Sequence, residues 1–150
     1  KNAEGHVYYG SATGFSAADR LALPNHGCRS LTLADVDRDG DIDLLFGSTG
    51  QDSGSSYTYH GEATLYYNDR GSFSVAESVG FPTLRNMGND IQDLNLDGYP
   101  DVIIGNYQSN STPSVNSQIY WGKQSGFDVS RTTALPTQGT WRSPTVVGGD

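Results

Sequence analysis

Two acidic stretches with the same spacing constrain this chain more than any other feature of its sequence. The first covers residues 35–43 and the second covers residues 93–101. In each stretch, side chains that carry oxygen occupy positions 1, 3, 5 and 9, and glycine occupies position 6. Glycine permits the sharp turn that lets alternate residues direct their oxygens to one point. Because Ca²⁺ binds six to eight oxygens, both stretches predict a calcium-binding loop.

A solvated acidic turn is the simplest alternative, because Asp and Gly are common in turns. It fits the first stretch poorly, since five aspartates within nine residues would repel one another without a cation. An EF-hand is a second alternative, but it requires a glutamate at position 12. That position holds Phe46 in the first loop and Ile104 in the second. We therefore expect a calcium loop of another kind.

The residues that follow each loop indicate which kind. Ile42–Gly47 and Asp101–Gly105 are short apolar runs, rich in β-formers and ended by glycine, which predict buried strands. A calcium loop that leads directly into a strand, with Asp at position 9, resembles the FG-GAP or VCBS repeat of integrin-alpha-type β-propellers. The resemblance covers nearly the whole chain. It implies two structural Ca²⁺ sites.

The resemblance also implies a ligand set, with side-chain oxygens at positions 1, 3, 5 and 9 and a main-chain carbonyl at position 7. The implied ligands of the first loop are Asp35, Asp37, Asp39 and Asp43, with the carbonyl of Asp41. Those of the second loop are Asp93, Asn95, Asp97 and Asp101, with the carbonyl of Tyr99. Calcium affinity follows the charge of the ligands. We therefore expect the first loop to bind more tightly than the second.

A repeat of about 57 residues organises the rest of the chain. The motif Val7–Gly10 recurs as Leu65–Asn68 and Ile119–Gly122, and an aromatic residue and an apolar–proline pair follow it each time. Four short strands at such a period are typical of a propeller blade. We therefore predict an all-β chain of β-propeller blades, each with four antiparallel strands, in about two and a half repeats.

The repeat also predicts boundaries. We expect a partial blade over 1–29, blades over 30–87 and 88–142, and the start of another over 143–150, where Asp150 would open a third loop. The predicted strands of the middle unit are Ser30–Ala34, Ile42–Gly47, Ala63–Asn68 and Phe73–Ser78. Because a propeller closes with four to eight blades, the chain is expected to be a fragment or to assemble with other chains.

The net charge of −8 comes from the loops rather than from the whole surface. The two loops and Asp150 hold nine of the 17 acidic residues, and the other eight face nine Lys and Arg residues. This balance gives no support to nucleic-acid binding, which needs a basic surface. No apolar run is long enough for a membrane span. Cys28 is the single cysteine and is expected to be a small buried residue.

Aromatic residues divide into repeating and non-repeating positions. Tyr9, Tyr67 and Trp121 are equivalent in the repeat and are expected to pack between blades. Four aromatics outside the repeat are candidates for ligand contact: Tyr57, Tyr59, Tyr107 and Trp141. The connections Ser48–Glu62 and Asn106–Gln118 are expected to be exposed loops on one face, where propellers commonly bind ligands. Asn110 begins a glycosylation sequon.

Nothing in the sequence predicts catalysis. The three histidines lack a common spacing, and the Asp52-Ser53-Gly54 segment has no oriented base. The resemblance implies a non-catalytic module, extracellular or at the cell surface, for adhesion or for binding a protein or glycan ligand. Two alternatives stay open: the non-catalytic part of a secreted polysaccharide-acting enzyme, and a structural subunit of an extracellular filament.

Overall fold

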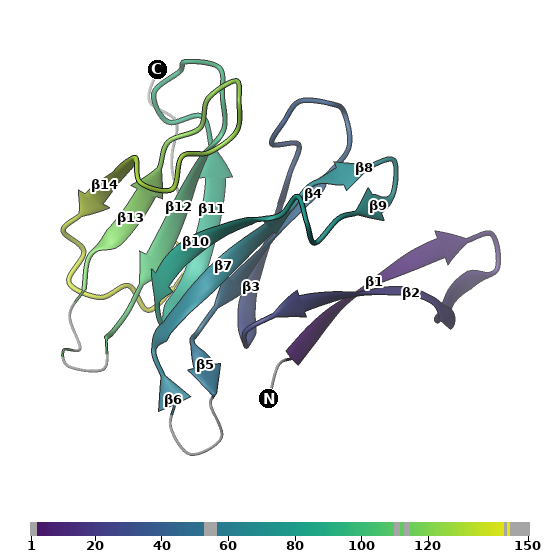
Figure 1. Cartoon of the computed structure of the whole chain (residues 1–150), viewed down its shortest axis with the longest axis horizontal. Coiled ribbons are helices and arrows are strands. Elements are labelled where there is room, and N and C mark those ends of the chain that lie inside the picture. Colours follow the sequence, from purple (N-terminus) through teal and green to yellow (C-terminus); the bar gives the residue numbers. More distant parts are fainter. Residues whose placement is uncertain (1–2, 53–56, 110–111, 113–114, 143, 145–150) are drawn as a thin grey trace.

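The computed structural model describes residues 3–52, 57–109, 112, 115–142 and 144. Within this part the chain is all-β, as predicted, with fourteen strands and no helix. The strands form two four-stranded antiparallel sheets and three two-stranded hairpins rather than a closed ring (Figure 1). Because no helix is present there, no described segment is a candidate for a helical membrane span.

The first four-stranded sheet is a meander: taken along the chain, each of its strands pairs with the next strand of the same sheet. Its strands are β3 (Cys28–Ala34), β4 (Asp43–Ser48), β7 (His60–Tyr66) and β10 (Val79–Leu84). The second sheet repeats this meander with β11 (Asn86–Gln92), β12 (Asp101–Asn106), β13 (Ser117–Tyr120) and β14 (Thr132–Leu135). The acidic loops occupy equivalent places, since one joins β3 to β4 and the other joins β11 to β12.

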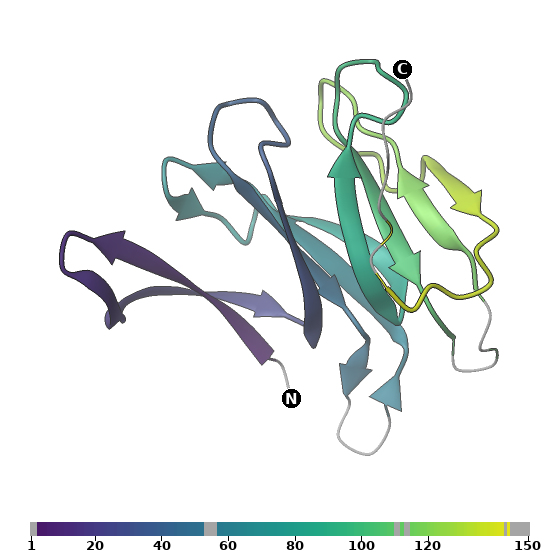
Figure 2. The same ribbon diagram turned by 180° about the vertical axis from the view of Figure 1, so that it is seen from behind.

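The three hairpins lie outside these sheets. Their strands are β1 (Ala3–Ser11) with β2 (Gly14–Asn25), β5 (Gln51–Asp52) with β6 (Tyr57–Thr58), and β8 (Asn68–Asp69) with β9 (Ser72–Phe73). The β1–β2 hairpin extends away from the sheets in both views (Figures 1 and 2). It is attached through Leu23, which packs against Phe46 and Tyr66 of the first sheet.

The main core lies between the two four-stranded sheets. It combines buried apolar side chains from both, at alternating positions of their strands. The largest members are Leu45, Leu65, Phe81, Val102, Ile104 and Tyr120. Each such burial stabilises the fold by about 1.5–3 kcal/mol. The core therefore ties the two sheets into one unit.

Polar side chains form a seam beside this core, where β11 crosses β3 and β4. Asn89 Nδ2 donates hydrogen bonds to Thr32 Oγ1 at 3.1 Å and to the carbonyl of Leu45 at 3.2 Å. Asn86 lies against Gly47, where a Cβ atom would overlap the amide oxygen of Asn86. Glycine at position 47 is thus required by the close approach of the sheets.

One hydrogen bond recurs between consecutive units. The hydroxyl of Tyr66 donates to the carbonyl of Pro24 at 2.7 Å, and that of Tyr120 donates to the carbonyl of Pro82 at 2.8 Å. Each tyrosine therefore reaches the proline strand of the preceding unit. The equivalent Tyr8 of β1 is 44% exposed.

The second aromatic of each pair, which we expected to pack between units, has no common role. Tyr9 donates to the carbonyl of Gly71 in the next unit, at 2.7 Å. Tyr67 packs against the main core. Trp121 Nε1 instead donates to Thr133 within its own sheet, at 3.0 Å. For Trp121, packing against a following unit stays a prediction, because residues 143 and 145–150 lie outside the described part.

The fourth strand predicted for the middle unit, Phe73–Ser78, is wrong. Phe73 belongs to the short β9, and the fourth strand of the sheet is β10. In β10, the buried Phe81 and Thr83 flank the exposed Pro82, an alternation that faces Phe81 to the core. Proline is tolerated because β10 is an edge strand.

Smaller differences concern the connections. The third strand covers His60–Tyr66 rather than Ala63–Asn68, and the predicted loop 48–62 contains β5 and β6. Cys28 is exposed rather than buried, because β3 is an edge strand and Cys28 is its first residue. Residues 143 and 145–150, with the third loop proposed at Asp150, lie outside the described residues.

Candidate metal sites

The two acidic loops share one backbone conformation. Position 4 has a positive φ in both, 68° at Arg38 and 58° at Leu96. Position 6 does so as well, with 95° at Gly40 and 92° at Gly98. Left-handed conformations suit glycine, which explains its place at position 6 of each loop. The repeated spacing in sequence is thus a repeated shape.

Backbone N–H groups orient the acidic side chains inside each loop. The N–H of Gly40 donates to Asp35 Oδ2 at 3.1 Å, and the N–H of Gly98 donates to Asp93 Oδ2 at 2.7 Å. The carboxylate at position 5 of each loop likewise accepts the N–H of position 7. These bonds direct oxygens inward without an ion.

The aspartates at position 9 have a role that the sequence did not predict. Asp43 is fully buried, and its two oxygens accept the N–H of Val36 at 2.7 Å and of Asn68 at 2.8 Å. Asp101 is buried in the same way and accepts the N–H groups of Leu94 and Gly122. Each of these aspartates joins the start of its loop to the chain beyond the sheet's third strand.

We call Asp43 and Asp101 the brace aspartates, because each joins its loop to a distant part of the chain. Burial raises the pKa of both carboxyls, because it disfavours the charged form. The hydrogen bonds from backbone N–H groups oppose this shift. Each carboxylate oxygen has a second lone pair after accepting one hydrogen bond. The brace role therefore leaves acceptor capacity for a cation.

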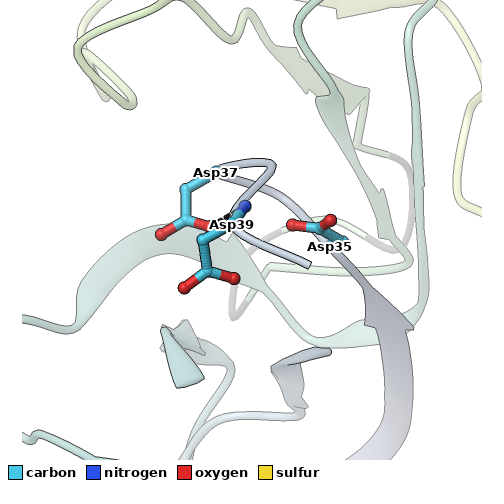
Figure 3. A group of neighbouring side chains, drawn as sticks. All are labelled: Asp35, Asp37 and Asp39. Carbon is cyan, nitrogen blue, oxygen red and sulfur yellow. Dashed lines mark hydrogen bonds between the residues drawn. The ribbon is translucent and has the colours of Figure 1, made fainter. Parts of the chain in front are cut away.

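Three carboxylates gather in the first loop (Figure 3). Oxygens of Asp35, Asp37 and Asp39 all lie within 4.8 Å of one another, with Asp35 facing the other two. Burial, and then the charges of Asp39 and Asp35, raise the pKa of Asp37. Exposed acidic groups of this kind are common without an ion, so the cluster alone is weak evidence for one.

A buried oxygen strengthens the case for a cation in the first loop. Asp35 Oδ1 is buried and accepts no hydrogen bond from the residues that the structure describes. An unsatisfied buried acceptor costs about 1–3 kcal/mol, and more when it is charged. A cation beside Asp35, Asp37 and Asp39 would satisfy it. The residues of the first loop therefore fit Ca²⁺.

In the second loop, a side-chain amide donates a hydrogen bond to one of the carboxylate oxygens. Asn95 Nδ2 donates to Asp97 Oδ2 at 2.9 Å. The pKa of Asp97 is lowered, first by the hydrogen bond from the N–H of Tyr99 and then by the one from Asn95. This loop offers the same oxygen positions with one charge fewer.

Side chains at position 7 point to other partners. Asp41 Oδ2 accepts the N–H of Arg70 at 2.8 Å, in the turn between β8 and β9. The ring of Tyr99 lies 5.4 Å from the guanidinium carbon of Arg38 in the other loop. The side chain at position 7 therefore differs between the loops because each one has its own partner elsewhere. Calcium binding by the main-chain carbonyls of Asp41 and Tyr99 stays a prediction.

The two loops face a common cavity of about 280 Å³, whose walls include Asp37, Arg38 and Tyr99. Both loops lie at the same end of the molecule in the two views (Figures 1 and 2). After the hydrogen bonds, the charges of Arg131 and then Arg38 make small contributions to the lowered pKa of Asp97.

At the opposite end, the structure brings together three of the four predicted ligand aromatics. Tyr107 contacts Trp141 edge to face, with ring centroids 4.5 Å apart. Arg85, which the sequence did not single out, lies over the rings of Tyr59 and Tyr107. Of the fourth aromatic, Tyr57, the structure gives only its place in β6. Ser53, Gly54 and Asn110 lie outside the described residues.

No family model matches the chain. The resemblance to the FG-GAP and VCBS repeats therefore depends on the loop spacing and the repeat alone.

Proposed function

We propose that this chain is a calcium-stabilised segment of a β-propeller that serves as a non-catalytic, extracellular binding module. The observation that carries the proposal is the repeated loop. The same conformation, with the same buried aspartate at its end, occupies the same place in two equivalent sheets. One of these loops also holds a buried oxygen that lacks a partner among the described residues.

In this proposal each four-stranded sheet is one blade. Support comes from the shared meander, from the core between the sheets and from the tyrosine bond to the preceding unit. The sheets span residues 28–84 and 86–135, close to the proposed blades 30–87 and 88–142.

Further blades or chains are proposed as partners. On the edge strand β3, Leu31 is 52% exposed and Leu33 is 58% exposed. Their neighbours Thr32 and Ala34 are only partly exposed, and Thr32 faces the second sheet. The free face of β3 thus carries apolar side chains that another sheet would cover. This observation also favours the filament alternative.

Ca²⁺ would supply a positive charge that relieves the repulsion within each loop. Asp35, Asp37 and Asp39 would hold it in the first loop, with Asp43 behind them. Asp93, Asn95, Asp97 and Asp101 are the corresponding residues of the second. Binding would add to the folding free energy, because the site is assembled only in the folded chain. Extracellular modules bind Ca²⁺ at about 10⁻⁴–10⁻³ M, and the proposed extracellular setting requires an affinity in this range.

The hydrogen bonds that these carboxylates accept favour a structural role over a catalytic one. The two buried aspartates accept backbone N–H groups with both oxygens. Such bonds fix the chain and occupy both oxygens of these two carboxylates, which favours a structural role for them over proton exchange with a substrate. The loop carboxylates likewise accept backbone N–H groups of their own loops.

Thermal unfolding tests this proposal. The full chain is melted in about 1 mM CaCl₂ and again with excess EDTA, beside the double variant Asp35→Ala with Asp93→Ala. We expect calcium to raise the Tm of the wild type and to leave that of the double variant unchanged. Magnesium at the same concentration is the control for ionic strength. A folded wild type with no calcium response would overturn the proposal, and light scattering on the same samples would report assembly.

A further inference from the structure

The residue that connects the two four-stranded sheets is an arginine in an unusual conformation. Arg85 is the single residue between β10 and β11, and its φ is 49°. Its N–H donates to the carbonyl of Tyr59 at 2.6 Å. Glycine or asparagine is the ordinary choice for such a backbone. A residue other than glycine is uncommon in this conformation, and such residues cluster at functional sites.

The guanidinium of Arg85 is held between aromatic rings. Its central carbon lies 4.7 Å from the ring centroid of Tyr59 and 5.2 Å from that of Tyr107. Nη1 donates to Gln108 Oε1 at 2.6 Å. These contacts fix the orientation of the side chain before any ligand arrives, which lowers the entropy cost of binding.

Arg85 has no acidic partner in the part of the chain that the structure describes. The ion pair found there joins Arg70 to Asp69. Only one of the five guanidinium N–H donors of Arg85 has a hydrogen-bond acceptor among the described residues. In a chain of net charge −8, a half-buried cation with open donors is suited to an anionic ligand.

An exposed aromatic surface continues from this cation. Trp141 is 57% exposed, and its ring meets Tyr107 at an interplanar angle of 78°. Arg85, Tyr107 and Trp141 therefore offer a fork of hydrogen-bond donors beside an apolar ring. An anionic sugar has both matching parts, since its acidic group suits the guanidinium and its C–H face packs on an indole. A simple acidic side chain of a peptide would use only the first part.

We propose that Arg85, Tyr107 and Trp141 form a binding site for an anionic glycan. This inference deepens the proposed function and rests on it, because it names the ligand class of the binding module. The connection from β10 to β11 lies at the end of the sheets opposite the two acidic loops (Figures 1 and 2). Glycan binding and calcium binding can therefore be tested separately.

Isothermal titration calorimetry of the full chain in about 1 mM CaCl₂ tests the inference with four probes. A hyaluronan hexasaccharide carries carboxylates, a heparin hexasaccharide carries sulfates as well, fully N-acetylated chitohexaose is neutral, and hexaglutamate is an acidic peptide. We expect at least one anionic hexasaccharide to bind about tenfold or more tightly than chitohexaose and hexaglutamate. The two anionic arms show whether a carboxylate suffices or a sulfate is needed.

Three variants assign the binding to this surface. Arg85→Gly suits the backbone conformation, so the variant should fold while it binds the anionic hexasaccharide at least about tenfold more weakly. Trp141→Ala should also weaken binding severalfold. Arg20→Ala removes an exposed arginine from β2 and should change nothing. Circular dichroism checks that each variant is folded.

Several results would overturn the inference. They are no binding of either anionic hexasaccharide, equal binding of chitohexaose, or an unchanged affinity in Arg85→Gly. Hexaglutamate binding that is as tight and insensitive to Trp141→Ala would point to a peptide ligand instead. The calcium shift of Tm in the same samples separates the two proposals. A shift without glycan binding refutes this site alone, while its absence refutes the calcium module.

Discussion

The two four-stranded sheets and their acidic loops share one backbone arrangement, but the loops carry different charges. Both loops turn at positions 4 and 6, and both end on a buried aspartate that accepts two backbone N–H groups. They differ at position 3, where Asp37 adds a charge and Asn95 instead donates to Asp97. Glycine and the buried aspartate thus fix the backbone shape, while position 3 sets the charge of the predicted side-chain ligands.

The largest expected effect comes from the braces and should be equal in both units. Asp43→Asn and Asp101→Asn each replace one acceptor oxygen by a donor, which leaves a buried N–H unpaired and two donors in conflict. We expect each to lower the free energy of unfolding by about 2–4 kcal/mol. Urea unfolding in EDTA measures this without calcium. Asp41→Asn, in the same loop, should cost much less. A large loss at one brace alone would break the equivalence of the units.

A second comparison concerns the glycines that follow each brace. A Cβ at Gly47 would overlap the side chains of Asn86 and Ser30, whereas one at Gly105 would lie 2.9 Å from the carbonyl of Gly88. Overpacking of this kind costs about 1–3 kcal/mol. We expect Gly47→Ala and Gly105→Ala both to destabilise the chain in urea unfolding. Wild-type stability for Gly47→Ala would contradict the close sheet contact.

Exchange of charge at position 3 should exchange the calcium behaviour of the loops. Asn95→Asp adds a ligand charge and removes the hydrogen bond to Asp97. We therefore expect a larger calcium-induced rise in Tm and a lower Tm in EDTA. Asp37→Asn should weaken calcium binding by the first loop about tenfold, and the calcium-induced rise in Tm should shrink accordingly. Differential scanning fluorimetry over a calcium series compares both with the wild type. If Tm depended on calcium concentration in the same way in the wild type and both variants, charge at position 3 would not distinguish the two loops.

The smallest effects concern the tyrosines that join each unit to the preceding one. Tyr66→Phe and Tyr120→Phe each remove one hydrogen bond and should cost about 1 kcal/mol. Burial raises the pKa of Tyr120 to about 12, above its ordinary value of about 10. The contribution of Tyr120 to stability should therefore be constant below pH 10 and fall as the pH rises from 10 to 12, because Tyr120 ionises there only in the unfolded chain. Tyr120→Phe should reduce this alkaline loss, as measured by urea unfolding at each pH.

Much of the fold could be predicted because the sequence repeats. The glycine of each loop, the apolar run after it and the recurring tyrosine pairs indicate an all-β chain and place both loops between strands. The fourth strand could not be placed, because Pro82 disguises a strand whose edge position is known only from the fold. The oxygens of the loops were found by spacing, and spacing says nothing of which oxygens are buried.

The residues that the sequence could not reveal act across long separations. Asp43 was predicted as a ligand from its position, but its bond to Asn68 depends on the return of the chain after β7. Arg85 joins Tyr59 and Tyr107 only because the sheets place three connections at one end. A motif search finds local patterns, whereas these groups form when the sheets pack.

We propose that two loops of one shape bind calcium with unequal strength, and calorimetric titration of the metal-free chain with CaCl₂ measures both sites at once. We expect two ions per chain, with the tighter site lost in Asp35→Ala and the weaker one lost in Asp93→Ala. Two sites of equal affinity would contradict the role of charge at position 3. A folded chain that binds no calcium would contradict the calcium sites altogether.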